Sequence, residues 1–200
     1  QADLADQFIG RGNPPGGCAL ITGNTFTSNS ADARKVGTGG WVVAKNVDTG
    51  EEFCSIQAAI DDSDTVNGHT IEVYAGVHTE NVIVNKSLTL KGANAGISPN
   101  DPGDPLLPNP ARVAETEMAV TGGGSAFLVR TANVTIDGFK FTDSAVAQAN
   151  VQTPIIGAGV NFGGDAPGVK IVNNLFHQTN RMVVYFLGPS LMQGGTVDDN

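Results

Sequence analysis

Two aspartates occupy equivalent positions in a repeated apolar pattern, and this spacing is the first feature that would support chemistry. Cleavage of a glycosidic bond commonly needs two carboxyl groups at a fixed separation across that bond. Asp137 is the fourth residue of Val134–Phe139, and Asp198 is the fourth residue of a weaker copy, Gly195–Asn200. The copy between them carries Val172 at the equivalent position, which interrupts the row of carboxylates. We therefore interpret Asp137 and Asp198 as turn residues at strand ends and predict no catalytic residues.

A second pair of carboxylates, Asp101 and Asp104, lies in the segment Ser98–Pro110, which holds five prolines and must form a loop. Calcium prefers oxygen ligands and takes roughly six to eight of them. Two carboxylates supply only part of such a set, so a solvated turn is the simpler interpretation. We predict no obligatory cofactor, and calcium is the ion that Asp101 and Asp104 would bind.

Three residues toward the end of the sequence combine charge with an aromatic ring. His177 and Arg181 flank a predicted turn, and Tyr185 follows in the next apolar segment. An aromatic ring offers a flat face to a sugar, and polar groups fix the orientation of a ligand. We predict that His177, Arg181 and Tyr185 contact a glycan. The alternative is that they are unrelated polar residues at the corners of the fold.

The sequence contains two cysteines, Cys18 and Cys54. In an oxidising compartment they would pair and tie the N-terminal segment to the helix predicted next to Cys54. The alternative is two buried thiols. We predict the disulfide.

The composition limits the fold and the partners. Charged residues make up only 16% of the chain and there are 26 glycines, which favours short strands and tight turns over a helical bundle. The net charge of −9 opposes binding to nucleic acid, so we exclude it as a partner. No apolar stretch is long enough to span a bilayer, so we predict no membrane insertion. The first residue is Gln1, which fits a processed, secreted chain or a fragment boundary.

The pattern of apolar residues changes along the chain. Ser55 is a plausible N-cap for a short amphipathic helix, because Ile56, Ala59 and Ile60 follow at helical spacing. After residue 69 the pattern has period two, which indicates strands. The strands that we predict lie at Ala19–Thr22, Thr70–Tyr74, Asn81–Val84, Ser87–Leu90, Ala126–Val129, Gly159–Phe162 and Met182–Phe186.

A degenerate repeat is the most informative feature for the fold. The third residues of its copies, Ile136, Ile171 and Val197, lie 35 and then 26 residues apart, and Leu90 fits the same register one copy earlier. Repeats of this length separated by unequal loops are typical of a solenoid, in which equivalent residues stack in one core. We predict an all-β fold, a right-handed parallel β-helix with a short N-terminal capping helix. The four residues should form one interior column within about five coils.

Four consecutive segments resemble the pectin-lyase-like superfamily of right-handed parallel β-helices. They are Phe53–Ile60 (FCSIQAAI), Gly68–Gly76 (GHTIEVYAG), Glu80–Val84 (ENVIV) and Lys86–Gly92 (KSLTLKG). The resemblance implies that the helix caps the N-terminal end of the β-helix and that the later segments form its first coils. The nearest resemblance is to β-helix modules of large secreted or surface proteins of Bacteroidetes-type bacteria.

This superfamily includes pectin methylesterases, pectate lyases, polygalacturonases and members without known activity, so the fold alone does not define a function. Gly76–Glu80 (GVHTE) is similar to the G-x-Y-x-E segment of pectin methylesterases, with His78 in place of Tyr. The motifs that supply their nucleophilic Asp, their acid/base Asp and their Arg have no match in this sequence.

We divide the chain into an N-terminal arm or linker at 1–40 and a β-helix at 41–200, which is expected to continue beyond residue 200. The capping helix is predicted near 55–61 and an outward loop near 93–110. The first hypothesis is a non-catalytic, secreted or cell-surface module for adhesion, surface structure or glycan binding. Its partners would be polysaccharide, other surface proteins, and further coils or another chain at the C-terminal end. The alternative is the N-terminal part of a polysaccharide lyase or hydrolase with its active site in later coils.

Overall fold

The computed structural model describes residues 42–120, 124–143, 154–159, 166–177, 184–187 and 196–198, and every structural statement below concerns these residues. The protein is all-β and consists mainly of parallel sheets, as the sequence predicts. One short α-helix, α3 (Ile56–Asp61), is present in the described part of the chain. The predicted N-terminal arm and the predicted strand Ala19–Thr22 lie outside the described residues.

Three sheets contain all the described strands. Sheet A has the order β15-β12-β9-β6-β3-β1-β2, sheet B the order β13-β10-β7-β4, and sheet C the order β14-β11-β8-β5. The strands of sheet A are β1 (Ala44–Asn46), β2 (Glu52–Phe53), β3 (Thr70–Val73), β6 (Thr89–Lys91), β9 (Thr135–Asp137), β12 (Lys170–Val172) and β15 (Thr196–Asp198). Those of sheet B are β4 (Gly76–His78), β7 (Thr116–Val120), β10 (Lys140–Asp143) and β13 (Leu175–His177). Those of sheet C are β5 (Val82–Val84), β8 (Phe127–Val129), β11 (Ile156–Gly159) and β14 (Val184–Leu187).

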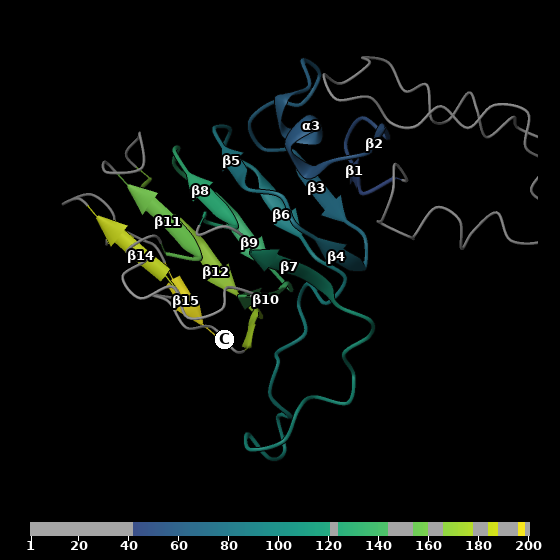
Figure 1. Ribbon diagram of the computed structural model, residues 1–200, viewed down its shortest axis with the longest axis vertical. Helices are drawn as coiled ribbons and strands as arrows, with labels where there is room; N and C mark the ends of the chain where they lie inside the picture. The colour runs from purple at the N-terminus through teal and green to yellow at the C-terminus, as the bar shows by residue number, and fades with distance from the viewer. Residues whose placement is uncertain are drawn as a thin grey trace, which may run out of the picture.

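From β3 onward the chain visits the three sheets in strict rotation, first A, then B, then C. Each strand pairs in parallel with the strand that occupies the same sheet one circuit later. Figure 1 shows the result as successive rows of strands that run from blue near the N-terminal end to yellow at the C-terminal end. Only β1 and β2 depart from this arrangement, because β1 pairs antiparallel with both β2 and β3.

The predicted register of the repeat is confirmed. Leu90 pairs with Ile136, Ile136 with Ile171, and Ile171 with Val197. Leu90, Ile136 and Ile171 are completely buried, as the predicted interior column requires. The side chain of Val197 lies outside the described set. Ile71 extends the column by one strand and is also completely buried.

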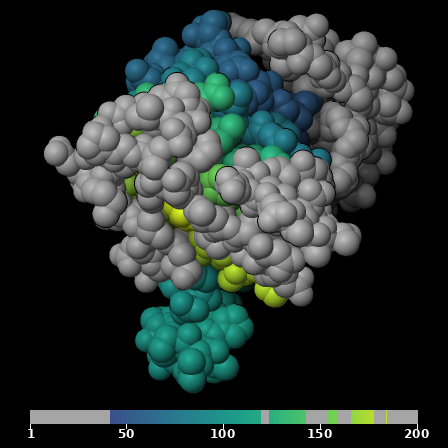
Figure 2. All heavy atoms as spheres, turned by 60° about the vertical axis from the view of Figure 1, so that its left-hand side comes forward, coloured from purple at the N-terminus to yellow at the C-terminus, as the bar shows by residue number. Residues whose placement is uncertain are grey.

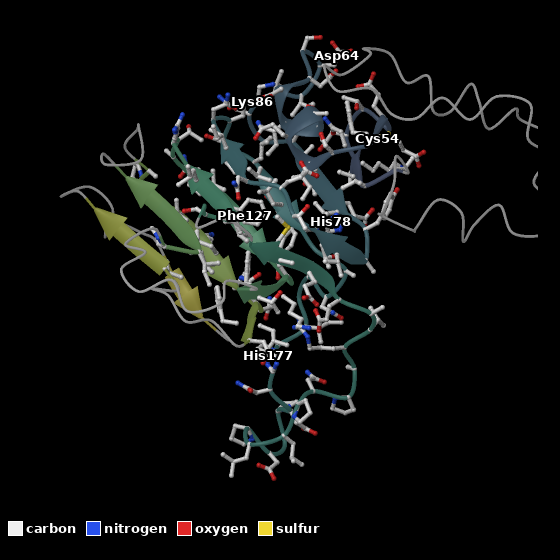
Figure 3. The ribbon with its side chains drawn as sticks, viewed as in Figure 1. Cys54, Asp64, His78, Lys86, Phe127 and His177 are labelled. Atoms are coloured by element: carbon white, nitrogen blue, oxygen red, sulfur yellow. The ribbon has the colours of Figure 1, made fainter. Side chains whose placement is uncertain are left out.

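Aromatic rings fill the interior where the three sheets meet. Phe127 of sheet C contacts Phe139 and Phe141 edge to face, with ring centroids 5.4 and 5.9 Å apart. Phe141 stacks on Phe176 of the next sheet B strand at 4.9 Å. These contacts join residues of sheets B and C into one core. Figure 3 shows Phe127 in the middle of the molecule.

The helix α3 covers the beginning of the sheets, at the top of Figure 1. Ser55 is its N-cap and accepts a hydrogen bond from the backbone N–H of Ala58, as predicted. The apolar face formed by Ile56, Ala59 and Ile60 is buried. The Glu80 carboxylate accepts hydrogen bonds from the N–H groups of Ile56 and Gln57, which satisfies donors that a helix start leaves unpaired. The helix is therefore tied to the following strands by its N-terminus as well as by its apolar face.

The corner between sheets A and B takes two different forms. After β9 and after β12, two residues connect the sheet A strand to the next sheet B strand. The first residue of each pair has positive φ: Gly138 at 77° and Asn173 at 55°. After β6 the chain instead makes a long excursion before β7 begins at Thr116. This excursion projects from the body of the molecule, at the bottom of Figures 1 and 2. The outward loop predicted near 93–110 is present, and it extends up to Thr116.

Internal hydrogen bonds hold the base of the projecting loop. Arg112 forms an ion pair with Glu115, and its guanidinium also donates to the carbonyl oxygens of Ile97 and Asn173. The Arg112 side chain is only 7% exposed. Asn94 is completely buried and its carboxamide bonds to the backbone of Val113 on the opposite side of the loop. The loop is therefore anchored to the sheets from which it emerges.

The predicted strand at Gly159–Phe162 overlaps the described strand β11 at Gly159, and β11 begins three residues earlier. The structure has β11 at Ile156–Gly159, and the residues after Gly159 up to Phe162 lie outside the described part. The physical reason is burial: Ile155, Ile156 and Ala158 are completely buried, whereas the prediction relied on the apolar letters that follow. The prediction also missed β4, β7, β10 and β13, which are all four strands of sheet B.

Candidate functional site

The outward face of sheet B carries a row of polar side chains from three neighbouring strands. We call it the sheet B row; it consists of Glu117, Lys140, Thr142 and His177. The alternation of a strand places these residues outside, because Met118 and Phe141 between them are buried in the core. Parallel pairing aligns Glu117 with Lys140, and Thr142 with His177. The row therefore combines an acid, a cation, a hydroxyl and an imidazole on one surface.

Glu117 is the centre of this row. The Lys140 ammonium lies 2.8 Å from Glu117 Oε2, and the Thr142 hydroxyl donates to Glu117 Oε1 at 2.7 Å. The side chains of Lys140 and Glu117 are 24% and 23% exposed, so the pair is partly shielded from water. Both carboxylate oxygens thus have a fixed protein donor and still face the surface.

These neighbours determine the charge of Glu117. Partial burial acts to raise the pKa of its carboxyl group, since burial disfavours the charged form. The hydrogen bonds from Lys140 and Thr142 oppose that effect, as do the positive charges of Lys140 and His177. The net pKa lies below its ordinary value of 4.5. Glu117 is therefore a fixed anion at neutral pH, and it is a poor proton donor there.

The structure places two of the three residues predicted to contact a glycan, His177 and Tyr185, on different sheets. His177 ends β13 of sheet B, and the residues after it, where the turn is predicted, lie outside the described part. Tyr185 lies in β14 of sheet C, aligned with Gly157, and Arg181 lies outside the described residues. His177 belongs instead with Glu117, Lys140 and Thr142. Figure 3 shows His177 toward the end of the molecule from which the loop projects. Glycan contact by the three predicted residues stays a prediction.

The two loop carboxylates stabilise turns of the loop itself. Asp101 Oδ1 accepts a hydrogen bond from the N–H of Gly103, and Asp104 Oδ1 accepts one from the N–H of Leu106. The N–H of Asp104 also donates to the carbonyl oxygen of Asp101. These are the contacts of a polar turn, which was the simpler interpretation. Calcium binding by Asp101 and Asp104 stays a prediction.

A different acidic group lies near the helix, at the end of the molecule where Figure 3 labels Asp64. One carboxylate oxygen from each of Glu51, Asp62 and Asp64 lies within 4.8 Å of the others. The sequence did not predict this group, because Glu51 comes from the turn between β1 and β2, whereas Asp62 and Asp64 follow the helix. Thr49 donates to Glu51 and the N–H of Asp64 donates to Asp62, so two members already have local partners.

Asp137 of the repeat stabilises the turns beside it, as the sequence predicts. Asp137 Oδ1 accepts hydrogen bonds from the carboxamide of Asn173 and from the N–H of Gly96. Val172 lies between Asp137 and Asp198 in the paired strands, as predicted, and the Asp198 side chain is outside the described set.

The structure records Cys54 as disulfide-bonded. Cys18, the other cysteine of the sequence, lies outside the described residues. The pairing of Cys18 with Cys54 therefore stays a prediction. Figure 3 shows Cys54 close to the helix, on the side of the molecule where the described chain begins.

Comparison with known proteins gives one partial similarity. No protein-family model matches the chain, and no solved structure matches it. A stretch of 61 residues, 30% of the chain, is 48% identical to a protein named "Cell surface glycoprotein" from Methanothermus fervidus. The match is partial. The chain spans about a tenth of the length of that relative, since the matched stretch covers 10% of it. In the described residues, no helix is both long and apolar enough to cross a membrane.

The sheet B row was missed for a physical reason. Three of its residues lie on β7 and β10, short strands that carry no copy of the repeat. The available signal was the alternation in Thr116–Val120 and in Lys140–Asp143, where polar residues flank a single large apolar residue.

Proposed function

We propose that this chain is a module of a secreted or cell-surface protein, folded as a right-handed parallel β-helix of the pectin-lyase-like type. In this proposal the module is non-catalytic, and its role is surface structure or adhesion. The sheet B row is its contact surface for glycan. Sheet B is favoured because three of its strands bring acidic, basic and hydroxyl groups together on one outward face.

The strict rotation of the chain through three parallel sheets supports the β-helix. Each circuit adds one strand to each sheet, and the interior residues of successive circuits stack in register. Such an arrangement tolerates excursions of any length at its corners, which accounts for the projecting loop between β6 and β7. The same capping helix and early strands carry the resemblance to the pectin-lyase-like superfamily.

The partial relative supports the surface location. Its printed name places that protein at the cell surface, and nearly half of the residues in the matched stretch are identical. The low charge and the high glycine and asparagine content of the chain fit an extracellular repeat module as well.

The charge state of Glu117 argues against Glu117 as the general acid of glycoside cleavage. Glycoside cleavage needs a carboxyl group that is protonated at working pH, together with a second carboxyl group across the bond. Glu117 is held as an anion by Lys140 and Thr142. A carboxylate in this state accepts hydrogen bonds from sugar hydroxyls, and Lys140 and His177 supply donors beside it. The row therefore suits binding better than proton transfer.

A binding experiment with matched variants tests the contact surface. The purified chain is incubated with polysaccharides extracted from the envelope of the producing organism, and bound polymer is measured by affinity electrophoresis. Lys140→Met and Glu117→Gln should weaken retardation at least several-fold. Lys170→Met, a change to an exposed lysine on sheet A, is the matched control and should leave it unchanged. Equal retardation of all variants, or none with the native chain, would reject sheet B as the contact surface.

The alternative, a part of a polysaccharide lyase or hydrolase, predicts a different result. Under our proposal the chain releases no unsaturated or reducing sugars from pectin, alginate or the envelope polysaccharides, with or without calcium. If the native chain releases such sugars and the Glu117→Gln variant does not, the enzymatic alternative is established.

A further inference from the structure

Two short motifs of the chain define candidate positions for a covalent modification. An Asn-x-Ser/Thr triplet, with x other than proline, is the acceptor sequence for N-linked glycans. The 200-residue sequence contains two such triplets, Asn85-Lys86-Ser87 and Asn133-Val134-Thr135. So short a motif also arises by chance. The placement of the triplets in the structure must therefore decide whether they are meaningful.

Both asparagines are exposed and both lie in turns. Asn85 follows β5 directly and precedes β6, while Asn133 lies between β8 and β9. Each triplet therefore occupies the corner at which the chain leaves sheet C and enters sheet A. Exposed turns accommodate a bulky, hydrated glycan without loss of core contacts.

The two corners are direct neighbours. β5 pairs with β8, and β6 pairs with β9, so the connecting turns belong to adjacent circuits. The Ser87 hydroxyl of the first triplet donates to the carbonyl oxygen of Ala132, the residue before the second triplet, at 2.6 Å. The N–H of Thr135 donates to the carbonyl oxygen of Leu88. The two acceptor sequences are thus stacked on one edge of the protein.

The carboxamide groups of these asparagines are available. Within the described part of the chain, no hydrogen bond involves the side chain of Asn85 or of Asn133. The Asn133 carboxamide rests with Oδ1 toward Gly168: a Cβ built on Gly168 would lie 2.5 Å from that oxygen, closer than any other atom of Asn133. Nδ2, the atom that bears a glycan, is the more distant end of the carboxamide.

Other asparagines serve the fold instead. Asn46, Asn94 and Asn174 are completely buried, and their carboxamides bond to backbone or side-chain groups. None of these three lies in an acceptor triplet. The asparagines whose carboxamides are bonded inside the fold and those that could carry a glycan are therefore different residues.

We propose that Asn85 and Asn133 are N-glycosylated, so that two glycans line the edge between sheets C and A. In the transfer, Nδ2 forms a bond to C1 of the first sugar of a lipid-phosphate-linked oligosaccharide. The bond from C1 to the phosphate oxygen breaks, the lipid phosphate leaves with that electron pair, and Nδ2 loses one proton to a base of the transferase. Because Ser87 is hydrogen-bonded in the folded corner, transfer takes place before the corner closes.

This inference rests on the proposed surface location, because a secreted chain is exposed to such lipid-linked donors. The glycans would lie at the corner between sheet C and sheet A. They would leave the sheet B row free, so glycan attachment and glycan contact would occupy different parts of the surface.

The test uses full-length protein purified from the producing organism. Digestion with trypsin gives the peptide Thr131–Lys140, which contains Asn133, and a peptide that contains Asn85. Mass spectrometry should find both peptides shifted by the mass of one oligosaccharide, with the added mass on the asparagine. A second measurement asks whether a membrane-impermeant reagent labels the protein on intact cells. If it does and the peptides are still unmodified, that result would overturn this inference and leave the surface location standing. Unmodified peptides together with no labelling would reject both.

Variants made in the producing organism sharpen the test. Asn85→Gln and Asn133→Gln should each remove one glycan mass from the intact protein and leave the other in place. Ser87→Thr keeps the acceptor sequence and should keep the glycan on Asn85. Asn100→Gln, at an exposed asparagine outside any triplet, is the matched control and should change only the mass of the side chain. A glycan mass that survives both glutamine variants would place the modification elsewhere and overturn the assignment.

Discussion

The two faces of sheet B differ by a single residue step along the same strands. On the inner face, His78, Met118, Phe141 and Phe176 follow one another in paired register toward the core. On the outer face, the sheet B row occupies the positions between them. The inner face is apolar apart from His78 and Thr116, and Phe141 is completely buried. The outer face contains an ion pair that water reaches. The inner face therefore determines whether the chain folds, and the outer face is free to determine what it binds.

Replacement of an inner residue should have the largest effect. Phe141→Ala removes a ring that contacts Phe127, Phe139 and Phe176. Burial of such a ring predicts a loss of about 3–5 kcal/mol in the free energy of unfolding. Urea denaturation followed by circular dichroism measures it. Leu106→Ala, on the loop tip where the side chain is 91% exposed, is the control and should change stability little. Similar losses for both variants would contradict the difference between core and surface.

A change at the corner that leads into sheet B should come next. In Gly138→Ala the new Cβ would lie 2.0 Å from the backbone nitrogen of Ala95, and φ is +77°. Gly50→Ala has a similar φ of +81° with no atom within 4 Å, so it isolates the conformational strain of roughly 1–2 kcal/mol. We expect Gly138→Ala to lower the melting temperature clearly more than Gly50→Ala. Equal shifts would mean that the close approach of the loop to the corner does not constrain the fold.

Removal of a buried amide should have a moderate effect. Asn174 accepts a hydrogen bond from the N–H of Phe139 and donates one to the carbonyl oxygen of Ile136. Asn174→Ala leaves both backbone groups without that partner inside the protein, at a cost of about 1–3 kcal/mol. Chemical denaturation measures the loss, and Asn100→Ala on the exposed loop provides the comparison. A neutral result for Asn174→Ala would show that this amide does not hold the corner.

The smallest effect on stability is expected on the outer face. Glu117→Gln at neutral pH should cost less than about 1 kcal/mol, because the Lys140 pair is partly exposed to water. The folded pKa of Glu117 is lower than its ordinary value of 4.5. Its contribution is therefore present above pH 4.5 and is lost as the pH falls through the folded pKa. The stability difference between native protein and variant should vanish in acid; a difference that grows there would contradict this charge assignment.

Sequence patterns predicted one part of this structure well. The register of Leu90, Ile136 and Ile171 followed from the V-x-I repeat because interior residues of parallel strands must align to share a core. Ser55 and the helix after it followed from capping chemistry. Both signals are local or periodic, so they can be recognised in the sequence without knowing which residues are neighbours in three dimensions.

The candidate site was less predictable, because it depends on which strands become neighbours. Glu117 and Lys140 are 23 residues apart in sequence and meet only because β7 pairs with β10 across a complete circuit. His177 was identified as a contact residue, but its predicted partner Tyr185 belongs to another sheet. The prediction of a strand at Gly159–Phe162 relied on Val160 and Phe162, whereas β11 already begins at the buried residue Ile156.

Labelling of intact cells tests the surface location most directly. Cells of the producing organism are treated with a membrane-impermeant amine reagent, and labelled lysines are identified by mass spectrometry. Lys91 and Lys170 are exposed, whereas the ammonium of Lys86 bonds to the carbonyl oxygen of Asp62 and that of Lys140 pairs with Glu117. The account predicts that Lys91 and Lys170 are labelled on intact cells as fully as after lysis, and ahead of Lys86 and Lys140. Labelling that occurs only after lysis would contradict a surface module.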